Sequence, residues 1–123
     1  MEQRDERRIR VGVIGGGHMG QYHVLVYRDL WDVDLVGIVD ADGAKARQLA
    51  AEYHTQAFTD YRELVGKVDV VSLAVPTHLH FSVARDLLEA GIGVLVEKPM
   101  TTTLEEAKEL FRVARQRGSV LHV

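Results

Sequence analysis

The chain has 123 residues, 46% of them hydrophobic, and a formal net charge of -3, which suits one compact domain. The small acidic excess argues against nucleic acid as the main partner, and the absence of cysteine excludes disulfides, thiolate metal sites and a cysteine nucleophile. No apolar run approaches the roughly 20 residues that span a bilayer and the charged start lacks a signal-peptide core, so we expect a cytoplasmic protein without membrane contact.

The first predicted strand is the apolar run Ile9–Ile14, and a loop with the pattern G-x-G-x-x-G follows it directly. The loop opens a helical stretch in which Met19, His23, Val26 and Tyr27 share one apolar face. In a dinucleotide-binding turn the three glycines allow the tight turn, the approach of the pyrophosphate to the backbone and close packing of the helix on the strand. The pyrophosphate then lies at the positive end of the helix dipole. The alternative is a glycine-rich turn that binds nothing. The predicted cofactor-binding residues are Gly15, Gly16, Gly17, His18, Met19 and Gly20.

The second predicted strand, Val33–Val39, ends at an acidic residue, Asp40, which lies 20 residues after the last glycine of the loop. A carboxylate at this place can accept hydrogen bonds from both hydroxyls of the adenosine ribose, and it repels the extra phosphate of NADP. We therefore predict that Asp40 binds the cofactor and that NAD is preferred over NADP. The alternative is that Asp40 only caps the next helix, which Asp42 could also do. A short third strand is predicted at Gln56–Phe58.

The fourth and fifth predicted strands are residues 68–75 and Gly93–Val96, and each leads to one of the two prolines of the chain. The segment after the fourth strand contains Pro76, Thr77 and two histidines, and Glu97-Lys98-Pro99 follows the fifth strand. Ligands of open α/β sheets bind at the carboxyl ends of the strands, so both segments lie where a ligand is expected. Hydride transfer from a carbinol needs a group that holds the hydroxyl and relays its proton, which a lysine can do. A solvated lysine at a strand end is the alternative.

The remaining elements are a helix with an apolar stripe from Leu104 to Ala114, a capping box of Thr103 with Glu106, and a sixth strand at residues 120–123. Six strands alternating with helices predict an α/β Rossmann fold, a doubly wound parallel sheet in the order 3-2-1-4-5-6 with helices on both faces. Residues 1–123 are assigned to this single dinucleotide-binding domain. Because the chain ends on an apolar strand, we expect that a second domain follows in the parent protein and is absent here.

His78 and His80 are spaced so that they could share a metal ion, but zinc sites use three or four protein ligands. The sequence offers no third candidate nearby, so no metal site is predicted. His23 is expected to pack on its helix face, and His122 is expected to have no ligand role.

The glycine loop, His23 and the two proline-containing segments together resemble the N-terminal domain of the glucose–fructose oxidoreductase / inositol dehydrogenase (Gfo/Idh/MocA) family, over residues 9–123. The Glu-Lys-Pro tripeptide is the most specific part of this resemblance. The resemblance implies that the peptide before the proline of the tripeptide is often cis and that the lysine lies near the substrate hydroxyl as the catalytic residue. The residues that it implies at the nicotinamide side and the reacting centre are Pro76, Thr77, His80, Glu97, Lys98 and Pro99.

The resemblance predicts an NAD-dependent oxidoreductase that transfers a hydride between nicotinamide and the hydroxyl of a sugar, inositol or nucleotide sugar. Members of the family have a second domain that supplies most of the substrate pocket, the catalytic histidine and usually the oligomer contact. We therefore expect that the parent protein is a homo-oligomer and that the isolated chain binds NAD but is inactive. The alternative is a non-catalytic, NAD(H)-sensing or regulatory Rossmann module, which would not need Lys98 at the hydride-transfer position. A P-loop phosphotransferase is excluded because the loop lacks the G-K-[ST] ending.

Overall fold

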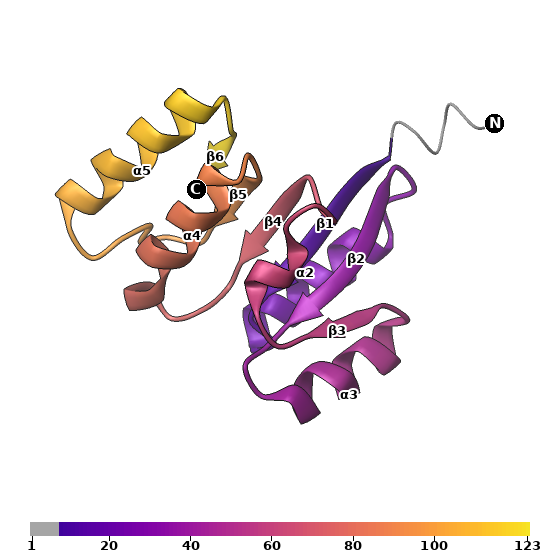
Figure 1. The fold of residues 1–123 in the computed structure, drawn as a ribbon. Coiled ribbons are helices and arrows are strands. Elements are labelled where there is room, and N and C mark those ends of the chain that lie inside the picture. The colour runs from indigo at the N-terminus through magenta and orange to yellow at the C-terminus, as the bar shows by residue number, and fades with distance from the viewer. Residues whose placement is uncertain (1–7) are drawn as a thin grey trace.

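The computed structural model describes residues 8–123, and this part of the chain forms a parallel sheet of six strands in the order β3-β2-β1-β4-β5-β6 (Figure 1). The predicted fold class and strand order are confirmed. Residues 1–7, which the sequence prediction assigned to the same domain, lie outside the described residues. The strands are β1 (Ile9–Ile14), β2 (Val33–Val39), β3 (Gln56–Phe58), β4 (Val70–Leu73), β5 (Gly93–Val96) and β6 (Leu121–His122). The helices are α2 (His18–Arg28), α3 (Gly43–Tyr53), α4 (His80–Glu89) and α5 (Leu104–Arg117), with 3-10 turns η1 (Tyr61–Leu64) and η2 (Thr77–Leu79).

Two strands are shorter than the sequence predicted. β4 was expected at residues 68–75 but ends at Leu73. The next N–H, that of Ala74, still donates to the Ile14 carbonyl of β1 at 2.8 Å, and Pro76 then leads into the 3-10 turn η2. β6 was expected at 120–123 but covers two residues, although the Val120 carbonyl already accepts from β5. After β4 the chain therefore leaves the sheet beside the glycine loop, where the Ala74 carbonyl lies close to Gly15.

The core lies on both faces of the sheet. Helices α2 and α3 cover one face of the sheet, where Val13, Ile38 and Leu49 belong to one buried cluster. Helices α4 and α5 lie together on the other face, where a larger buried cluster includes Leu87 and Leu110. The periodic patterns predicted helices at the right places, but the predicted faces were wrong in part. In α2 the buried residues are Gly20 and Val24, whereas Met19 and Val26 are exposed; in α5 Leu104 and Phe111 are exposed.

The helix ends follow from the polar residues beside them. The Asp42 side chain accepts from two backbone N–H groups in the first turn of α3. Thr103 caps α5 by accepting from the N–H of Glu106 at 3.2 Å, but the Glu106 carboxylate accepts from the Thr102 hydroxyl, so the second half of the expected capping box is not formed. Gly118 ends α5 with a positive φ of 69°. Within residues 8–123, no helix is both long and apolar enough to cross a membrane.

Candidate functional site

The glycine loop connects β1 to α2, and its glycines serve different purposes. Gly15 has a φ of +107°, and a Cβ there would lie 2.4 Å from the Ala74 carbonyl oxygen. A Cβ on Gly20 would lie 1.7 Å from the Gly15 carbonyl oxygen. Both glycines are therefore required by the fold itself. Gly17 is different, because a Cβ there would meet nothing within 4 Å and its backbone (φ -76°, ψ -167°) is open to any residue.

The open space at Gly17 lies at the start of α2. The first backbone N–H groups of a helix have no acceptor within the helix and carry the positive end of its dipole. His18 and Met19, which begin the helix, are exposed. The loop thus combines free N–H groups with room for a group to approach the backbone, and this combination is what an anion such as a pyrophosphate requires.

Asp40 holds the end of β2 against this loop. One oxygen of its carboxylate accepts from the Gly16 N–H at 2.9 Å, and the other accepts from the Asp42 N–H at 2.9 Å. A Cβ on Gly16 would lie 2.7 Å from the carboxylate, so the glycine makes the contact possible. The helix cap of α3 is Asp42, so the alternative prediction that Asp40 only caps this helix is wrong. Each carboxylate oxygen keeps a further lone pair to offer.

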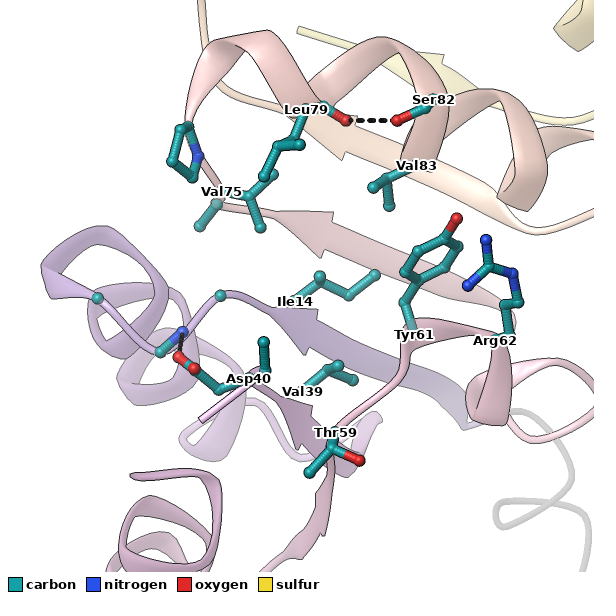
Figure 2. A pocket seen from close by; sticks show the side chains of 16 residues that line it. Ile14, Val39, Asp40, Thr59, Tyr61, Arg62, Val75, Leu79, Ser82 and Val83 are labelled. Carbon is teal, nitrogen blue, oxygen red and sulfur yellow. Dashed lines mark hydrogen bonds between the residues drawn. The ribbon is translucent and has the colours of Figure 1, made fainter. Parts of the chain in front are cut away.

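A cleft of about 580 Å³ extends from the glycine loop along the carboxyl ends of the strands. This volume lies within the range of small-molecule and cofactor sites. Figure 2 shows Leu79 and Val83 on one side of the cleft and Asp40 on the other. The walls are mostly apolar, and their polar groups come from the glycine loop, Asp40, Thr59, the turn η1 and Ser82 of α4.

The far end of the cleft is lined by Tyr61 and Arg62 of η1 (Figure 2). The Tyr61 hydroxyl donates to the Asp86 carboxylate of α4 at 2.5 Å. Partial burial, followed by this hydrogen bond, raises the pKa of Tyr61 to about 12, so the phenol stays neutral over the physiological range. The Arg62 guanidinium lies 4.7 Å from the centre of the Tyr61 ring and 3.6 Å from the Asp86 carboxylate. Sequence reasoning missed this cluster, because neither side chain belongs to a recognisable motif.

The segments after β4 and β5 are joined by His80, the first residue of α4. Its ring is only 2% exposed. Nε2 lies 2.9 Å from the Val75 carbonyl oxygen, and Nδ1 lies 3.0 Å and 3.2 Å from the carbonyl oxygens of Met100 and Pro99. The ring therefore contacts protein carbonyl groups at both nitrogens and is not among the residues that line the cleft.

The predicted site residues therefore fall into two groups. Gly15, Gly16, Gly17, Asp40 and Pro76 all line the cleft. The other predicted residues lie outside its lining: His18 and Met19 are exposed on α2, Gly20 is buried beneath the loop and Thr77 is half-buried in η2. Beyond the fifth strand Glu97 is half-buried, Lys98 and Pro99 are exposed, and the peptide between Lys98 and Pro99 is cis, as the resemblance implied.

The sequence suggested only a packing role for His23, but both nitrogens of its ring also have polar partners. Its Nδ1 lies 3.0 Å from the Ser72 hydroxyl of β4, and its Nε2 lies 2.9 Å from a carboxylate oxygen of Glu97. The Tyr27 hydroxyl also contacts Ser72. One signal for this network was present in the sequence, since Ser72 is the polar residue in the otherwise apolar strand β4. Among residues 8–123, no group of three or more His, Asp or Glu side chains could hold a metal ion.

Comparison with known proteins agrees with this geometry. A profile of the GFO_IDH_MocA family, an oxidoreductase family with an NAD-binding Rossmann fold, matches residues 9–123. UDP-N-acetylglucosamine 3-dehydrogenase of Acidithiobacillus ferrooxidans is 39% identical over 115 residues, which cover 94% of this chain and 36% of that protein. A solved structure of that dehydrogenase matches with a TM-score of 0.89.

Two further solved structures contain a dinucleotide. GenD2 from gentamicin A biosynthesis, in complex with NAD, is 35% identical with a TM-score of 0.91, and the match covers 94% of this chain and 34% of that one. KijD10, a 3-ketoreductase from Actinomadura kijaniata in complex with TDP-benzene and NADP, is 31% identical with a TM-score of 0.87, covering 93% of this chain and 36% of that one. The chain spans about a third of the length of these relatives. It belongs to the Gfo/Idh/MocA oxidoreductase family and forms the NAD-binding Rossmann domain of that family.

Proposed function

We propose that this chain is the cofactor-binding part of an NAD-dependent dehydrogenase that acts on a hydroxyl of a sugar, an inositol or a nucleotide sugar. The observation that carries the proposal is that the open Gly17 backbone and the Asp40 carboxylate lie together in one cleft. The named relatives, among them a UDP-N-acetylglucosamine 3-dehydrogenase, support the substrate class. When bound, the dinucleotide supplies the hydride acceptor or donor.

The residues of the cleft fit the parts of a dinucleotide. The loop from Gly15 to Gly20 would hold the pyrophosphate through backbone N–H groups, with Gly17 leaving room for its approach. Asp40 would accept hydrogen bonds from the ribose hydroxyls, using the lone pairs that its two backbone contacts leave. Pro76 and Thr77 would lie on the nicotinamide side, and His80 would hold their segment against the segment after β5.

Asp40 also supports a preference for NAD over NADP. A carboxylate at the ribose would repel the extra phosphate of NADP at short range. Relatives of this chain have been solved with either cofactor, so the family alone does not decide the preference. The local charge at the end of β2 is therefore the argument for NAD.

Lys98 is the residue that we propose to act on the substrate. It is exposed, so its ammonium or amine group is accessible to hold a substrate hydroxyl and relay its proton. Lys98 is not among the residues that line the cleft, and the relatives are about three times as long as this chain. We propose that a second domain of the complete protein covers Lys98, completes the substrate pocket and forms the oligomer contact, so the isolated chain binds NAD but has little or no turnover.

Two measurements test this proposal. Calorimetric titration of the chain should show tighter binding of NAD than of NADP, and equal or reversed affinities would remove Asp40 from its proposed role. In the complete protein, Lys98→Ala should reduce kcat by at least about 100-fold with little change in the Kd for NAD, as expected for loss of a general acid–base group. Normal turnover in Lys98→Ala would mean that this lysine is only a solvated surface residue.

A further inference from the structure

A continuous row of hydrogen-bonding side chains crosses the interior from α2 to the Glu-Lys-Pro segment. Ser72 of β4 is fully buried, with a relative exposure of 0%. Two side chains of α2 contact its hydroxyl, Tyr27 and His23, and the other nitrogen of the His23 ring contacts Glu97. The His23 side chain is 14% exposed and that of Glu97 is 42% exposed. The row therefore connects a buried strand to the residue that precedes Lys98.

With Glu97 ionised and the His23 ring neutral, the chemistry of these groups determines the direction of every hydrogen bond in the row. An ionised carboxylate can only accept, so Nε2 of His23 must carry a proton that it donates to Glu97. In a neutral imidazole, Nδ1 is then an acceptor, and the Ser72 hydroxyl must donate to it. The Tyr27 hydroxyl in turn donates to the oxygen of Ser72. All donors point towards Glu97, and this arrangement defines one tautomer of His23.

The same segment is held on its other side. The Pro99 carbonyl lies 3.2 Å from Nδ1 of the buried His80. Lys98 thus stands between two neighbours that are each anchored by a histidine ring, although Lys98 itself is exposed. Groups at a reacting centre need to be held within a fraction of an ångström by the residues that support them.

We propose that His23 is a positioning residue of the oxidoreductase: its Nε2–H holds the Glu97 carboxylate and thereby sets the position of Lys98 at the reacting centre. This inference rests on the proposed function, because it assumes that Lys98 acts on the substrate. It also assigns a purpose to Ser72 and Tyr27, which fix the tautomer of His23 through the far nitrogen of its ring.

The first test measures the tautomer directly in this chain. Long-range 1H–15N correlation spectra distinguish a proton on Nε2 from one on Nδ1. The His23 ring should show the Nε2–H form, and Glu97→Ala should change its nitrogen signals, whereas Glu105→Ala, which alters an exposed carboxylate of α5, should not. An Nδ1–H form in the original chain, or signals that Glu97→Ala leaves unchanged, would overturn the inference.

The second test uses the complete protein and two variants of similar size. In His23→Gln the side-chain amide can take the place of Nε2 and still donate to Glu97, whereas the shorter amide of His23→Asn takes the place of Nδ1 and cannot reach it. We expect His23→Asn to lower kcat at least about tenfold while the Kd for NAD stays within about twofold, and His23→Gln to recover most of the lost turnover. An unchanged Kd also shows that the variant domain is folded.

The outcomes separate this inference from the proposed function. If Lys98→Ala abolishes turnover while His23→Asn retains it, the inference is wrong and the proposed function stands. Equal losses of turnover in His23→Asn and His23→Gln would also overturn the inference, because the donor at Nε2 would then not matter. Full turnover in Lys98→Ala would overturn both.

Discussion

Replacement of Gly17 by valine separates binding from folding, because the structure predicts very different effects on the two. The added side chain meets no protein atom within 4 Å and the backbone there has a negative φ. The remaining penalty is that valine is a poorer N-cap than glycine, which costs about 1 kcal/mol or less. Gly20→Ala is the matched control within the same loop, since its new Cβ would lie 1.7 Å from the Gly15 carbonyl oxygen.

The effect on binding follows from the position of Gly17 at the open start of α2. A branched side chain there would hold the pyrophosphate away from the free N–H groups of the helix. Loss of one hydrogen bond to a charged group costs about 1.5–3 kcal/mol, which corresponds to a Kd for NAD that is about 10- to 150-fold higher. Gly17→Val should therefore weaken NAD binding by this factor and leave the free energy of unfolding within about 1 kcal/mol of the original.

Calorimetric titration with NAD measures the Kd for NAD. Urea denaturation, monitored by circular dichroism on the same samples, measures the free energy of unfolding. Gly20→Ala should lower the urea midpoint clearly, and Gly17→Val should not. Unchanged NAD affinity in Gly17→Val would mean that the pyrophosphate binds elsewhere. A collapse of stability in Gly17→Val would mean that the space at Gly17 is not open.

Three further predictions concern other parts of the domain. Asp40→Ser should weaken NAD binding and lower the ratio of NAD to NADP affinity, measured by calorimetry; an unchanged ratio would contradict the assigned role. Asp86→Asn should lower the pKa of Tyr61 from about 12, measured by tyrosinate absorbance. This folded-state pKa lies above the value of about 10 in an unfolded chain. The hydrogen bond of Tyr61 to Asp86 therefore stabilises the fold fully below about pH 10, and this stabilisation is lost as the pH rises through 12. A difference in the free energy of unfolding between Asp86→Asn and the original that does not change with pH would refute this reasoning. Leu110→Ala, at a site with 0% exposure, should cost about 2–5 kcal/mol in urea denaturation, and a loss below about 1 kcal/mol would contradict this packing.

The parts of the fold that the sequence predicted correctly are those with local signals. Four strands have the predicted bounds because their apolar runs end at turn residues, and the strand order is that of the doubly wound fold which the alternation of strands and helices predicted. The sequence placed the glycine loop after the first strand and Asp40 at the end of the second, and the structure brings the two together through the Gly16 N–H.

The parts that the sequence did not predict depend on contacts between distant segments. His23 contacts Ser72 and Glu97, which lie 49 and 74 residues further along the chain, so no local pattern could relate them. The ring of His80 is buried between backbone carbonyls, because α4 begins at this residue between the two loops. The sequence of a motif does not show whether the ring of its histidine faces a ligand or the backbone.

A crystal structure of this chain grown with saturating NAD tests the central claim most directly. The account predicts the pyrophosphate over the backbone N–H groups at Gly17 and the adenosine ribose hydroxyls on the Asp40 carboxylate. A dinucleotide bound at another surface, or an empty cleft at saturating NAD, would contradict it.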